Sequence, residues 1–271
     1  KMIGFPNCKI NLGLYIENKR VDGFHNIKTV FYPVNLCDGL EISQADNELS
    51  MQVSGIAING DIENNLCVKA FRVFEKEFNL PPIHIELLKT IPHGAGLGGG
   101  SSDAAFMFKL LNDFFKLNLS ENQLINYASN LGSDCTFFIE NKAVIASEKG
   151  NIFKNIKLSL KDLYIIIIKP PINVSTPDAY RWVNPRNKVV DIEQIIKKPI
   201  TDWRHLLIND FEESLFNKYP EIEAIKKELY KYGALYASMS GSGSSVFGLF
   251  ENQIPDITIN NQYFIWKSKL L

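Results

Sequence analysis

Apolar and polar side chains alternate along the first clear element of the chain. Between residues 9 and 16 every second side chain is apolar, and the positions between them hold Lys9, Asn11, Gly13 and Tyr15. Because side chains point alternately to the two faces of a β-strand, the pattern predicts a strand that carries a lysine and an asparagine on one face. Shorter apolar runs predict further strands at residues 30–34, 39–42, 84–88, 163–168, 235–239 and 246–250.

Helical periodicity predicts helices at residues 65–78, 104–117, 120–131 and 220–232. The segment 104–117 is apolar almost all round, which is typical of a buried helix. Ser120 begins a capping-box pattern, and we expect the helix that follows it to end at Gly132. Pro220 occupies a first helical position and Gly233 closes that helix. Strands and helices do not alternate regularly, which favours an α+β fold over a doubly wound parallel sheet.

The polar stretch 149–161 is the predicted domain boundary. At roughly 150 residues per domain, a chain of 271 residues has room for two domains. We therefore expect an N-terminal domain at residues 1–155 and a C-terminal domain at residues 156–271, the second opening with the buried strand at 163–168.

Composition excludes several classes of function. Lysine and arginine number 29 and aspartate and glutamate 30, so the formal charge is −1 and no positive field attracts nucleic acid or an anionic membrane. The longest apolar run, 163–168, is far too short for a membrane span, and no leader-like pattern opens the sequence. The four cysteines form no CxxC pair and do not cluster with histidines, which argues against zinc and disulfides. These features predict a cytoplasmic protein that binds neither nucleic acid nor membrane.

The glycine-rich stretch from Pro92 to Ala105 is the most informative motif. Five glycines fall among the seven residues 94–100, directly before a predicted helix. Glycines let the backbone approach an anion, a helix N-terminus supplies N–H donors and positive potential, and Ser101 and Ser102 add hydroxyls. The stretch therefore predicts a phosphate-binding loop, against the alternative of a merely flexible loop.

This loop does not fit the common phosphate-binding motifs. It contains no lysine, which a Walker A motif requires at the helix start. The spacing Gly94-x-Gly96-x-x-Gly99 satisfies the dinucleotide fingerprint, but the strand ending in an acidic residue that should follow is replaced by predicted helix. The H-R-D and D-F-G motifs of protein kinases are absent from the sequence.

Further features carry candidate chemistry, and each also has a plain structural interpretation. Asp134 follows a helix stop, where an aspartate is commonly an N-cap, and Lys9 could snorkel from a strand edge. The run Ser240–Ser245 could be a simple hairpin turn, although it is longer than a turn requires. Phe24 and Tyr180 could be core residues, or they could stack on a nucleobase.

Taken together, three motifs resemble those of the GHMP kinases, which include galactokinase and the homoserine, mevalonate and phosphomevalonate kinases. The family's second motif resembles Pro92 followed by residues 94–105, its first the strand at 9–14, and its third the run 240–247. The motifs occur in the family's order and span most of the chain. The resemblance implies a two-lobed α+β fold, with an N-terminal lobe like the second domain of ribosomal protein S5, a ferredoxin-like C-terminal lobe, and ATP held between them.

Within this superfamily, four stretches resemble one branch: residues 8–12, 20–25, 98–100 and 131–134. That branch uses ATP to phosphorylate the 2-hydroxyl of 4-diphosphocytidyl-2-C-methyl-D-erythritol, giving the 2-phosphate and ADP, in non-mevalonate isoprenoid synthesis. The branch more often has alanine at Cys8 and tyrosine at Phe24. Two alternatives remain, a GHMP kinase for homoserine, mevalonate or a sugar, and a non-catalytic nucleotide-binding regulator. Phe24, His25 and Tyr180 argue against the first, and retention of Lys9 and Asp134 argues against the second.

The resemblance also implies a role for each site residue. Asp134 would abstract the proton of the acceptor hydroxyl, while Lys9 would pair with Asp134 and offset charge near the transferred group. The implied ATP-side residues are Asn65, Leu66, Lys89, Pro92, Gly94, Ala95, Gly96, Leu97, Gly98, Gly99, Gly100, Ser101 and Ser102. The implied acceptor-side residues are Asn11, Phe24, His25, Thr176, Tyr180, Ser240, Gly241 and Gly243, of which Phe24, His25 and Tyr180 would hold the cytosine. Mg²⁺ is expected to bind together with ATP, and Ser102 is one candidate for a protein ligand of the ion. The chain is expected to be a monomer or a homodimer.

Overall fold

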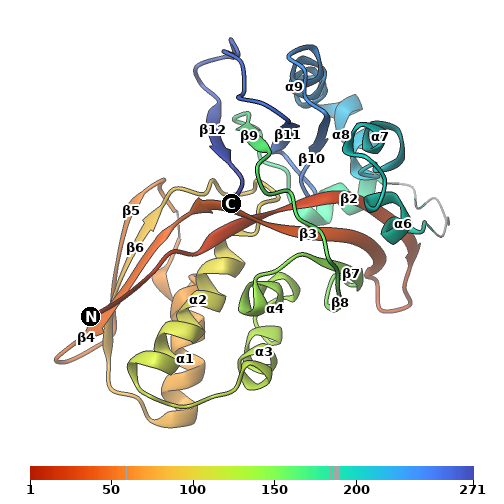
Figure 1. Cartoon of the computed structure of the whole chain (residues 1–271). Helices are drawn as coiled ribbons and strands as arrows, with labels where there is room; N and C mark the ends of the chain where they lie inside the picture. Colours follow the sequence, from red (N-terminus) through yellow and green to blue (C-terminus); the bar gives the residue numbers. More distant parts are fainter. Residues whose placement is uncertain (59, 184, 186–189) are drawn as a thin grey trace. The chain divides into compact units, whose positions relative to one another are not determined.

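The structure is a computed structural model that describes residues 1–58, 60–183, 185 and 190–271 (Figure 1). The chain divides into two compact units whose segments interleave along the sequence. Unit 1 contains residues 1–8, 36–93 and 98–142, and unit 2 contains residues 9–35, 94–97 and 143–271. The boundary at 155/156, which lies within the polar stretch 149–161, stays a prediction.

Unit 1 is a four-stranded sheet with two helices against one face (Figure 1). Its elements are β1 (Met2–Gly4), β4 (Gly39–Gln44), β5 (Ser50–Gly55), β6 (Ile83–Lys89), a 3-10 turn (Ile62–Asn64), α1 (Leu66–Phe78), α2 (Gly99–Phe114), α3 (Glu121–Ser129) and α4 (Ser133–Glu140). The strand order is β1-β4-β6-β5, in which only the β5–β6 pair is parallel. Ile83, Ile85 and Leu87 of β6 are buried in alternation with more exposed residues, as expected for a sheet covered on one face.

Helix α2 begins earlier than the sequence pattern predicts. It starts at Gly99 rather than at Ala104, so Ser101, Ser102 and Asp103 belong to its first turns. Gly98 is the N-cap and has a φ of +73°, a left-handed conformation that glycine adopts without steric cost. The glycine run therefore forms the helix start itself, which apolar periodicity could not reveal.

The segment after α3 also differs from the prediction. The capping box at Ser120 is confirmed, but α3 ends at Ser129 rather than at Gly132. Gly132 is instead the N-cap of α4, a helix that the sequence pattern did not predict. Asp134 lies in the first turn of α4, so the interpretation of this aspartate as an N-cap is wrong.

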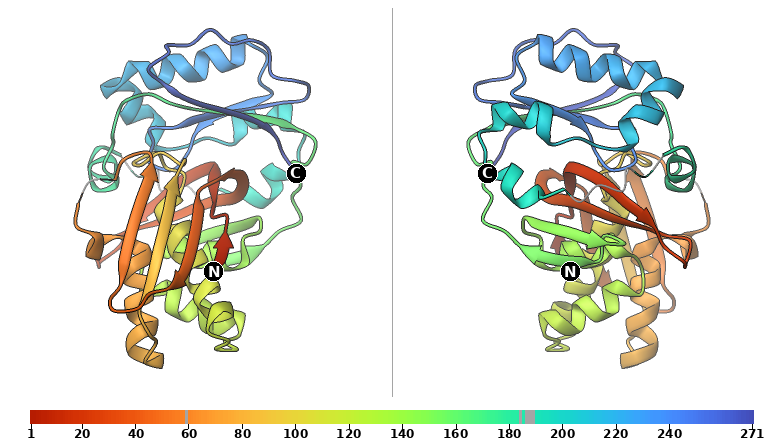
Figure 2. Two further views of the ribbon diagram at one scale, coloured as in Figure 1. Left: turned by 90° about the vertical axis from the view of Figure 1, so that its left-hand side faces the viewer. Right: turned by 90° about the vertical axis from the view of Figure 1, so that its right-hand side faces the viewer.

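Unit 2 contains two antiparallel sheets and most of the C-terminal helices. Its elements are β2 (Asn7–Lys19), β3 (His25–Cys37), β7 (Val144–Glu148), β8 (Ile152–Asn155), β9 (Tyr164–Lys169), β10 (Tyr236–Met239), β11 (Val246–Phe250), β12 (Phe264–Lys269), α5 (Thr176–Trp182), α6 (Ile192–Ile196), α7 (Ile200–Leu206), α8 (Phe211–Lys218) and α9 (Pro220–Lys231). The ends of β2 and β3, residues 7–8 and 36–37, belong to unit 1. One sheet has the order β2-β3-β7-β8 and the other β10-β11-β9-β12. Helices α8 and α9 lie along one face of the second sheet (Figure 2).

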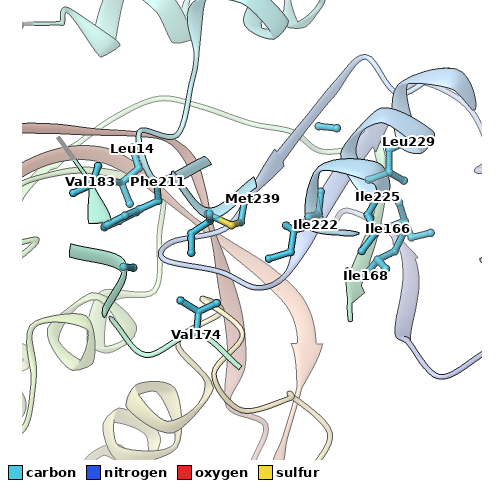
Figure 3. Close-up of a cluster of buried hydrophobic side chains, with 14 of the residues drawn as sticks. Leu14, Ile166, Ile168, Val174, Val183, Phe211, Ile222, Ile225, Leu229 and Met239 are labelled. Atoms are coloured by element: carbon cyan, nitrogen blue, oxygen red, sulfur yellow. The ribbon is translucent and has the colours of Figure 1, made fainter. Parts of the chain in front are cut away.

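The core of unit 2 holds strand β2 in place. Leu14 and Ile16 of β2 belong to one buried apolar cluster with Ile166 and Ile168 of β9 and with Leu229 of α9 (Figure 3). The strand predicted at 9–16 is confirmed, but it is buried on both faces rather than on one. Burial of both faces fixes the side chains of Lys9 and Asn11, which the sequence analysis places in the candidate site.

Weak periodicity explains which elements of unit 2 escaped prediction. Helices α5, α6 and α7 have five to seven residues each, too few to display a helical repeat. Strand β8 lies inside the polar stretch that the sequence analysis assigned to a boundary, and it pairs with β7. Over the described ranges, no helix combines the length and the apolar character that crossing a membrane would need.

Candidate functional site

Lys9 is a buried lysine with a defined set of acceptors in unit 2. Its side chain lies within β2 and is only 4% exposed, so the interpretation of a lysine snorkelling to solvent is wrong. Its ammonium nitrogen donates to Asn11 Oδ1 at 2.7 Å and to the Gly96 carbonyl at 3.1 Å. It also lies 4.8 Å from the centre of the Phe31 ring, within the range of a cation–π contact. The first predicted motif therefore positions a cation directly on the glycine-rich loop.

Gly96 makes the closest backbone approach in this part of the site. Its φ is +72°, and a Cβ atom at this position would lie 1.9 Å from the Ser240 carbonyl oxygen. Only glycine can occupy such a position without moving the backbone. The carbonyl of Gly96 also accepts the hydroxyl proton of Ser240 at 2.8 Å, so loop and third motif are held in direct contact.

Backbone hydrogen bonds extend this contact along both neighbours of the loop. They run from the amides of Ser244, Ser245 and Lys9 to the carbonyls of Gly94, Ala95 and Leu97, at 3.3, 3.3 and 2.9 Å respectively. Residues 240–245 do join the antiparallel strands β10 and β11, so the hairpin interpretation holds for the topology. The run is nevertheless packed rather than exposed, since Ser240, Ser244 and Ser245 are fully buried. The structure thus brings the first and third motifs together around residues 94–97 of the second.

In unit 1 the start of α2 presents the remaining part of the glycine-rich loop. Its first turn is composed of Gly99, Gly100, Ser101 and Ser102, and the N-terminal amides of a helix favour anions. The Ser102 hydroxyl is buried and has no hydrogen-bond partner within the described part of the chain. A buried hydroxyl in a helix start is a suitable oxygen ligand for Mg²⁺ or for a phosphate.

The start of α1 lies against the start of α2 in unit 1. Asn65 is the N-cap of α1, where its Oδ1 accepts the Cys67 amide proton at 2.9 Å. The side chain of Leu66 reaches to 3.7 Å from the position that a Cβ atom of Gly100 would take. These two residues, expected on the ATP side, are therefore adjacent to the helix start that is predicted to bind phosphate.

Lys89 forms a buried ion cluster with two carboxylates, those of Asp38 and Asp103. Its ammonium donates to Asp103 in α2 at 2.6 Å and to Asp38, which precedes β4. Asp38 also accepts the amide protons of Thr90 and Ile91, at 2.6 and 2.8 Å. The cluster ties the residues before the loop to the helix after it, while the direct ATP contact expected of Lys89 stays a prediction.

Burial and the oppositely charged neighbours act in opposite directions on the pKa values of Lys89 and Asp103. Burial opposes the charge on Lys89, but Asp103 and Asp38 outweigh it and raise the pKa of the ammonium. Burial also raises the pKa of the Asp103 carboxyl, more than Lys89 lowers it. One cation cannot balance two buried carboxylates, and Asp38 has the additional backbone donors. The Asp103 carboxyl, whose Oδ1 lacks a partner among the described residues, therefore has a pKa raised to about 7.

The residues expected to hold cytosine lie together in unit 2. The rings of His25 and Tyr180 stack with centres 4.8 Å apart and planes inclined by 15°. Phe24, which precedes His25 in the sequence, is 59% exposed, so the core interpretation is wrong for this ring. Tyr180 is half-buried and its ring meets Phe211 edge-on at 4.9 Å, so it also packs on the core. Burial lowers the pKa of His25, which favours a neutral ring with one donor and one acceptor.

The third motif contacts helix α5, which carries Thr176 and Tyr180. The hydroxyls of Thr176 and Ser242 are 3.1 Å apart. Gly241 and Gly243 both have positive φ values, +55° and +88°, which give the run its tight course. Asn209 supports this run by donating its side-chain amide to the carbonyls of Met239 and Gly241, at 2.9 and 2.8 Å.

Sequence reasoning missed several residues that support the site. Asn209, Asp38 and Thr29 carry no local signal, because their partners lie far away along the chain. Asp103 could have been identified from the sequence, since it directly follows Ser101 and Ser102 in the loop motif. Asp134, predicted as the base, is half-buried in unit 1, whereas Lys9 belongs to unit 2.

Comparisons with known proteins agree with the motifs. Residues 65–142 match the family model of the GHMP kinases N terminal domain, and residues 192–258 match that of the GHMP kinases C terminal. A 4-diphosphocytidyl-2-C-methyl-D-erythritol kinase of Bacteroides thetaiotaomicron is 54% identical, with 99% of this chain and 100% of that protein aligned. The chain belongs to the 4-diphosphocytidyl-2-C-methyl-D-erythritol kinase family. The family's kinase of Cytophaga hutchinsonii is 49% identical over 93% of both chains.

Solved structures of other kinases have a similar fold. A crystal structure of a 4-(cytidine 5'-diphospho)-2C-methyl-D-erythritol kinase aligns with a TM-score of 0.79 and 29% identity, over 92% of this chain and 90% of that one. The mevalonate kinase of Methanococcus jannaschii aligns with a TM-score of 0.71 and 16% identity, over 100% and 98%, which shows a shared fold. The α+β GHMP kinase fold expected from the sequence is confirmed.

Gly96→Ala should destabilise the kinase by more than the unfavourable backbone conformation of an alanine alone would. The added Cβ would clash with the Ser240 backbone, whereas at Gly233 (φ +91°) a Cβ meets no atom of the described chain within 4 Å. We expect Gly233→Ala to cost about 1–2 kcal/mol, the price of a left-handed alanine. Gly96→Ala should cost clearly more in urea unfolding and should abolish ATP turnover. Equal losses in the two variants would contradict the close approach.

Lys89→Met should destabilise the kinase strongly. The change leaves Asp38 and Asp103 buried without their cation, and removing one partner of a buried pair costs about 3–5 kcal/mol. The matched control is Lys69→Met, an exposed lysine of α1, which should change the unfolding free energy by less than about 0.5 kcal/mol. Adding Asp103→Asn to Lys89→Met should recover part of the loss. A Lys89→Met variant as stable as the control would show that the cluster does not support the fold.

Proposed function

We propose that this chain transfers the γ-phosphoryl group of ATP to the 2-hydroxyl of 4-diphosphocytidyl-2-C-methyl-D-erythritol, giving the 2-phosphate and ADP. The observation that carries the proposal is the buried Lys9 ammonium held 3.1 Å from the Gly96 carbonyl of the glycine-rich loop. Phosphoryl transfer requires positioning and neutralisation of negative charge, and a fixed cation on a phosphate-binding loop supplies both. The relatives described above carry the name of this activity.

Each group of residues has one task in the reaction. The start of α2 and the amides of the loop bind the phosphates of ATP, and Lys9 offsets charge on the transferred group. The oxygen of the acceptor hydroxyl forms a bond to the γ-phosphorus while the bond to the leaving oxygen of ADP breaks. Asp134 accepts the hydroxyl proton, a general-base contribution of roughly 10²–10⁴-fold.

A magnesium ion fits the residues of this site if ATP supplies most of its ligands. Within the described part of the chain, no three His, Cys, Asp or Glu side chains group as a metal site. The buried Ser102 hydroxyl is the side-chain oxygen that would complete the coordination shell at the start of α2. When bound, Mg²⁺ neutralises phosphate charge, as in other ATP-dependent transferases.

Recognition of the acceptor falls to the aromatic group of unit 2. The neutral ring of His25 can hydrogen-bond to the edge of a cytosine, and Phe24 and Tyr180 offer ring faces for stacking. We also infer that the enzyme works in the cytoplasm, which agrees with four cysteines that form no disulfide, Cys8, Cys37, Cys67 and Cys135.

Asp134→Asn tests the base, with the wild type as reference. Wild-type enzyme should consume ATP with the cytidine diphosphate conjugate and not with homoserine or mevalonate, and phosphorus NMR should locate the new phosphate at the 2-position. Asp134→Asn should keep both KM values and lose roughly 10²-fold or more in kcat, because an amide cannot accept the proton. Asp113→Asn, an exposed aspartate of α2, should keep wild-type kcat. A preference for homoserine or mevalonate would refute the substrate, and unchanged kcat in Asp134→Asn would refute the base.

Tyr180→Ala tests the cytosine subsite. Stacking on a base contributes about 1–3 kcal/mol, so the acceptor KM should rise roughly 5- to 150-fold while the ATP KM stays constant. Tyr180→Phe retains the ring and should keep the acceptor KM near the wild-type value. If alanine and phenylalanine give the same acceptor KM, Tyr180 does not stack on the base.

A further inference from the structure

A chain of hydrogen bonds in unit 2 links Lys9 to a threonine that no motif includes. Asn11 Oδ1 accepts from Lys9 at 2.7 Å, and Asn11 Nδ2 donates to the Thr29 hydroxyl at 3.0 Å. The Thr29 hydroxyl in turn donates to the Gly13 carbonyl. Lys9, Asn11 and Thr29 are all at least nine-tenths buried, so water does not compete freely for these bonds.

The Gly13 carbonyl at the end of this series of hydrogen bonds determines which group donates in each of them. A backbone carbonyl can only accept, so the single hydroxyl proton of Thr29 is committed to Gly13. The Thr29 oxygen can then only accept from Asn11, which must turn its NH₂ group toward it. The carbonyl oxygen of the Asn11 amide therefore faces Lys9.

The opposite orientation of the Asn11 amide would lose both bonds at once. Its NH₂ group would then face the Lys9 ammonium at 2.7 Å, donor against donor. Its oxygen would face the Thr29 hydroxyl, whose proton is already used. The two ends of an asparagine amide are nearly identical in shape, so only such a network decides between them.

A second series of hydrogen bonds connects Asn11 to the glycine-rich loop through Ser240, so that the bonds form a closed ring. The backbone amide of Asn11 donates to the Ser240 hydroxyl at 3.2 Å, and that hydroxyl donates to the Gly96 carbonyl at 2.8 Å. Lys9 donates to the same carbonyl at 3.1 Å. These two acceptors of the Lys9 ammonium are thus fixed, the Gly96 carbonyl by Ser240 and the Asn11 amide by Thr29.

We propose that Thr29 is a positioning residue of the kinase, which fixes the amide orientation of Asn11 and through it the place of the Lys9 ammonium. The inference rests on the proposed function, in which Lys9 acts on the transferred phosphoryl group. Thr29 does not touch a reacting atom in this scheme; its hydroxyl acts through Asn11 alone. The required feature is therefore a hydroxyl at position 29, while the β-branched shape serves strand β3.

Three variants separate the hydroxyl from the shape of the side chain. Thr29→Val keeps the branched shape and removes the hydroxyl, and kcat should fall roughly 5- to 30-fold with unchanged ATP KM, the effect of a buried hydrogen bond. Thr29→Ser keeps the hydroxyl and should retain kcat within about twofold. Tyr32→Phe is the matched control: it removes a hydroxyl on the same strand, one that accepts the Leu160 amide proton at 2.9 Å, and should leave kcat unchanged.

The side-chain amide of Asn11 gives a readout that does not depend on activity. Its NMR signal, assigned by its loss in Asn11→Ala, should shift in Thr29→Val and stay in place in Thr29→Ser and Tyr32→Phe. The proposal is overturned if Thr29→Val keeps wild-type kcat, if Thr29→Ser is impaired as severely as Thr29→Val, or if the Asn11 signal does not move. If Thr29→Val does not fold, Thr29→Ala carries the same two measurements.

The design also separates this inference from the proposed function. If the wild type does not phosphorylate the cytidine diphosphate conjugate, the proposed function fails, and the Asn11 signal still decides whether Thr29 orients the amide. If the wild type is active and Thr29→Val behaves like Tyr32→Phe, only the role of Thr29 fails.

Discussion

The approach of Gly96 to Ser240 is the constraint on which the site of unit 2 depends. At this point two backbones meet so closely that a single Cβ atom would lie 1.9 Å from a carbonyl oxygen. The contact aligns residues 94–97 between strand β2 and the third motif, and hydrogen bonds on both sides follow from it. Lys9 finds its acceptor on Gly96 only because that segment is held there. Glycine in the loop therefore serves packing between motifs, in addition to the phosphate binding predicted from the sequence.

Unit 1 secures its part of the loop by a different interaction. Lys89 binds Asp38 and Asp103, which lie on the two sides of the glycine run in sequence. A buried ion cluster is weak evidence of added stability. It does constrain the positions of its side chains, because a displaced carboxylate loses its cation. The cluster therefore specifies where α2 begins relative to β6. An apolar contact would tolerate small shifts of the helix start that a phosphate site would not.

Local patterns predicted the elements and motifs whose signals lie within a few residues. The alternation around Lys9 predicted β2, and the glycine run with Ser101 and Ser102 predicted a helix start at a phosphate loop. The sequence could not reveal α4, since Gly132 reads equally well as the end of one helix or the start of the next. It also could not reveal Thr29 or Asn209, because their hydrogen bonds cross 18 and about 30 positions of sequence. Side chains whose role is to orient another group have no motif of their own.

The two buried lysines are oriented by different kinds of acceptor. Lys89 is bound by carboxylates, which compensate its charge and make it an anchor. Lys9 donates to an amide oxygen and to a backbone carbonyl, and these two acceptors orient the ammonium. A dipole can be as directional as a carboxylate. Orientation by neutral oxygens then requires that their own direction be fixed. For a backbone carbonyl the fold supplies this, and for the Asn11 amide it takes the Thr29 hydroxyl.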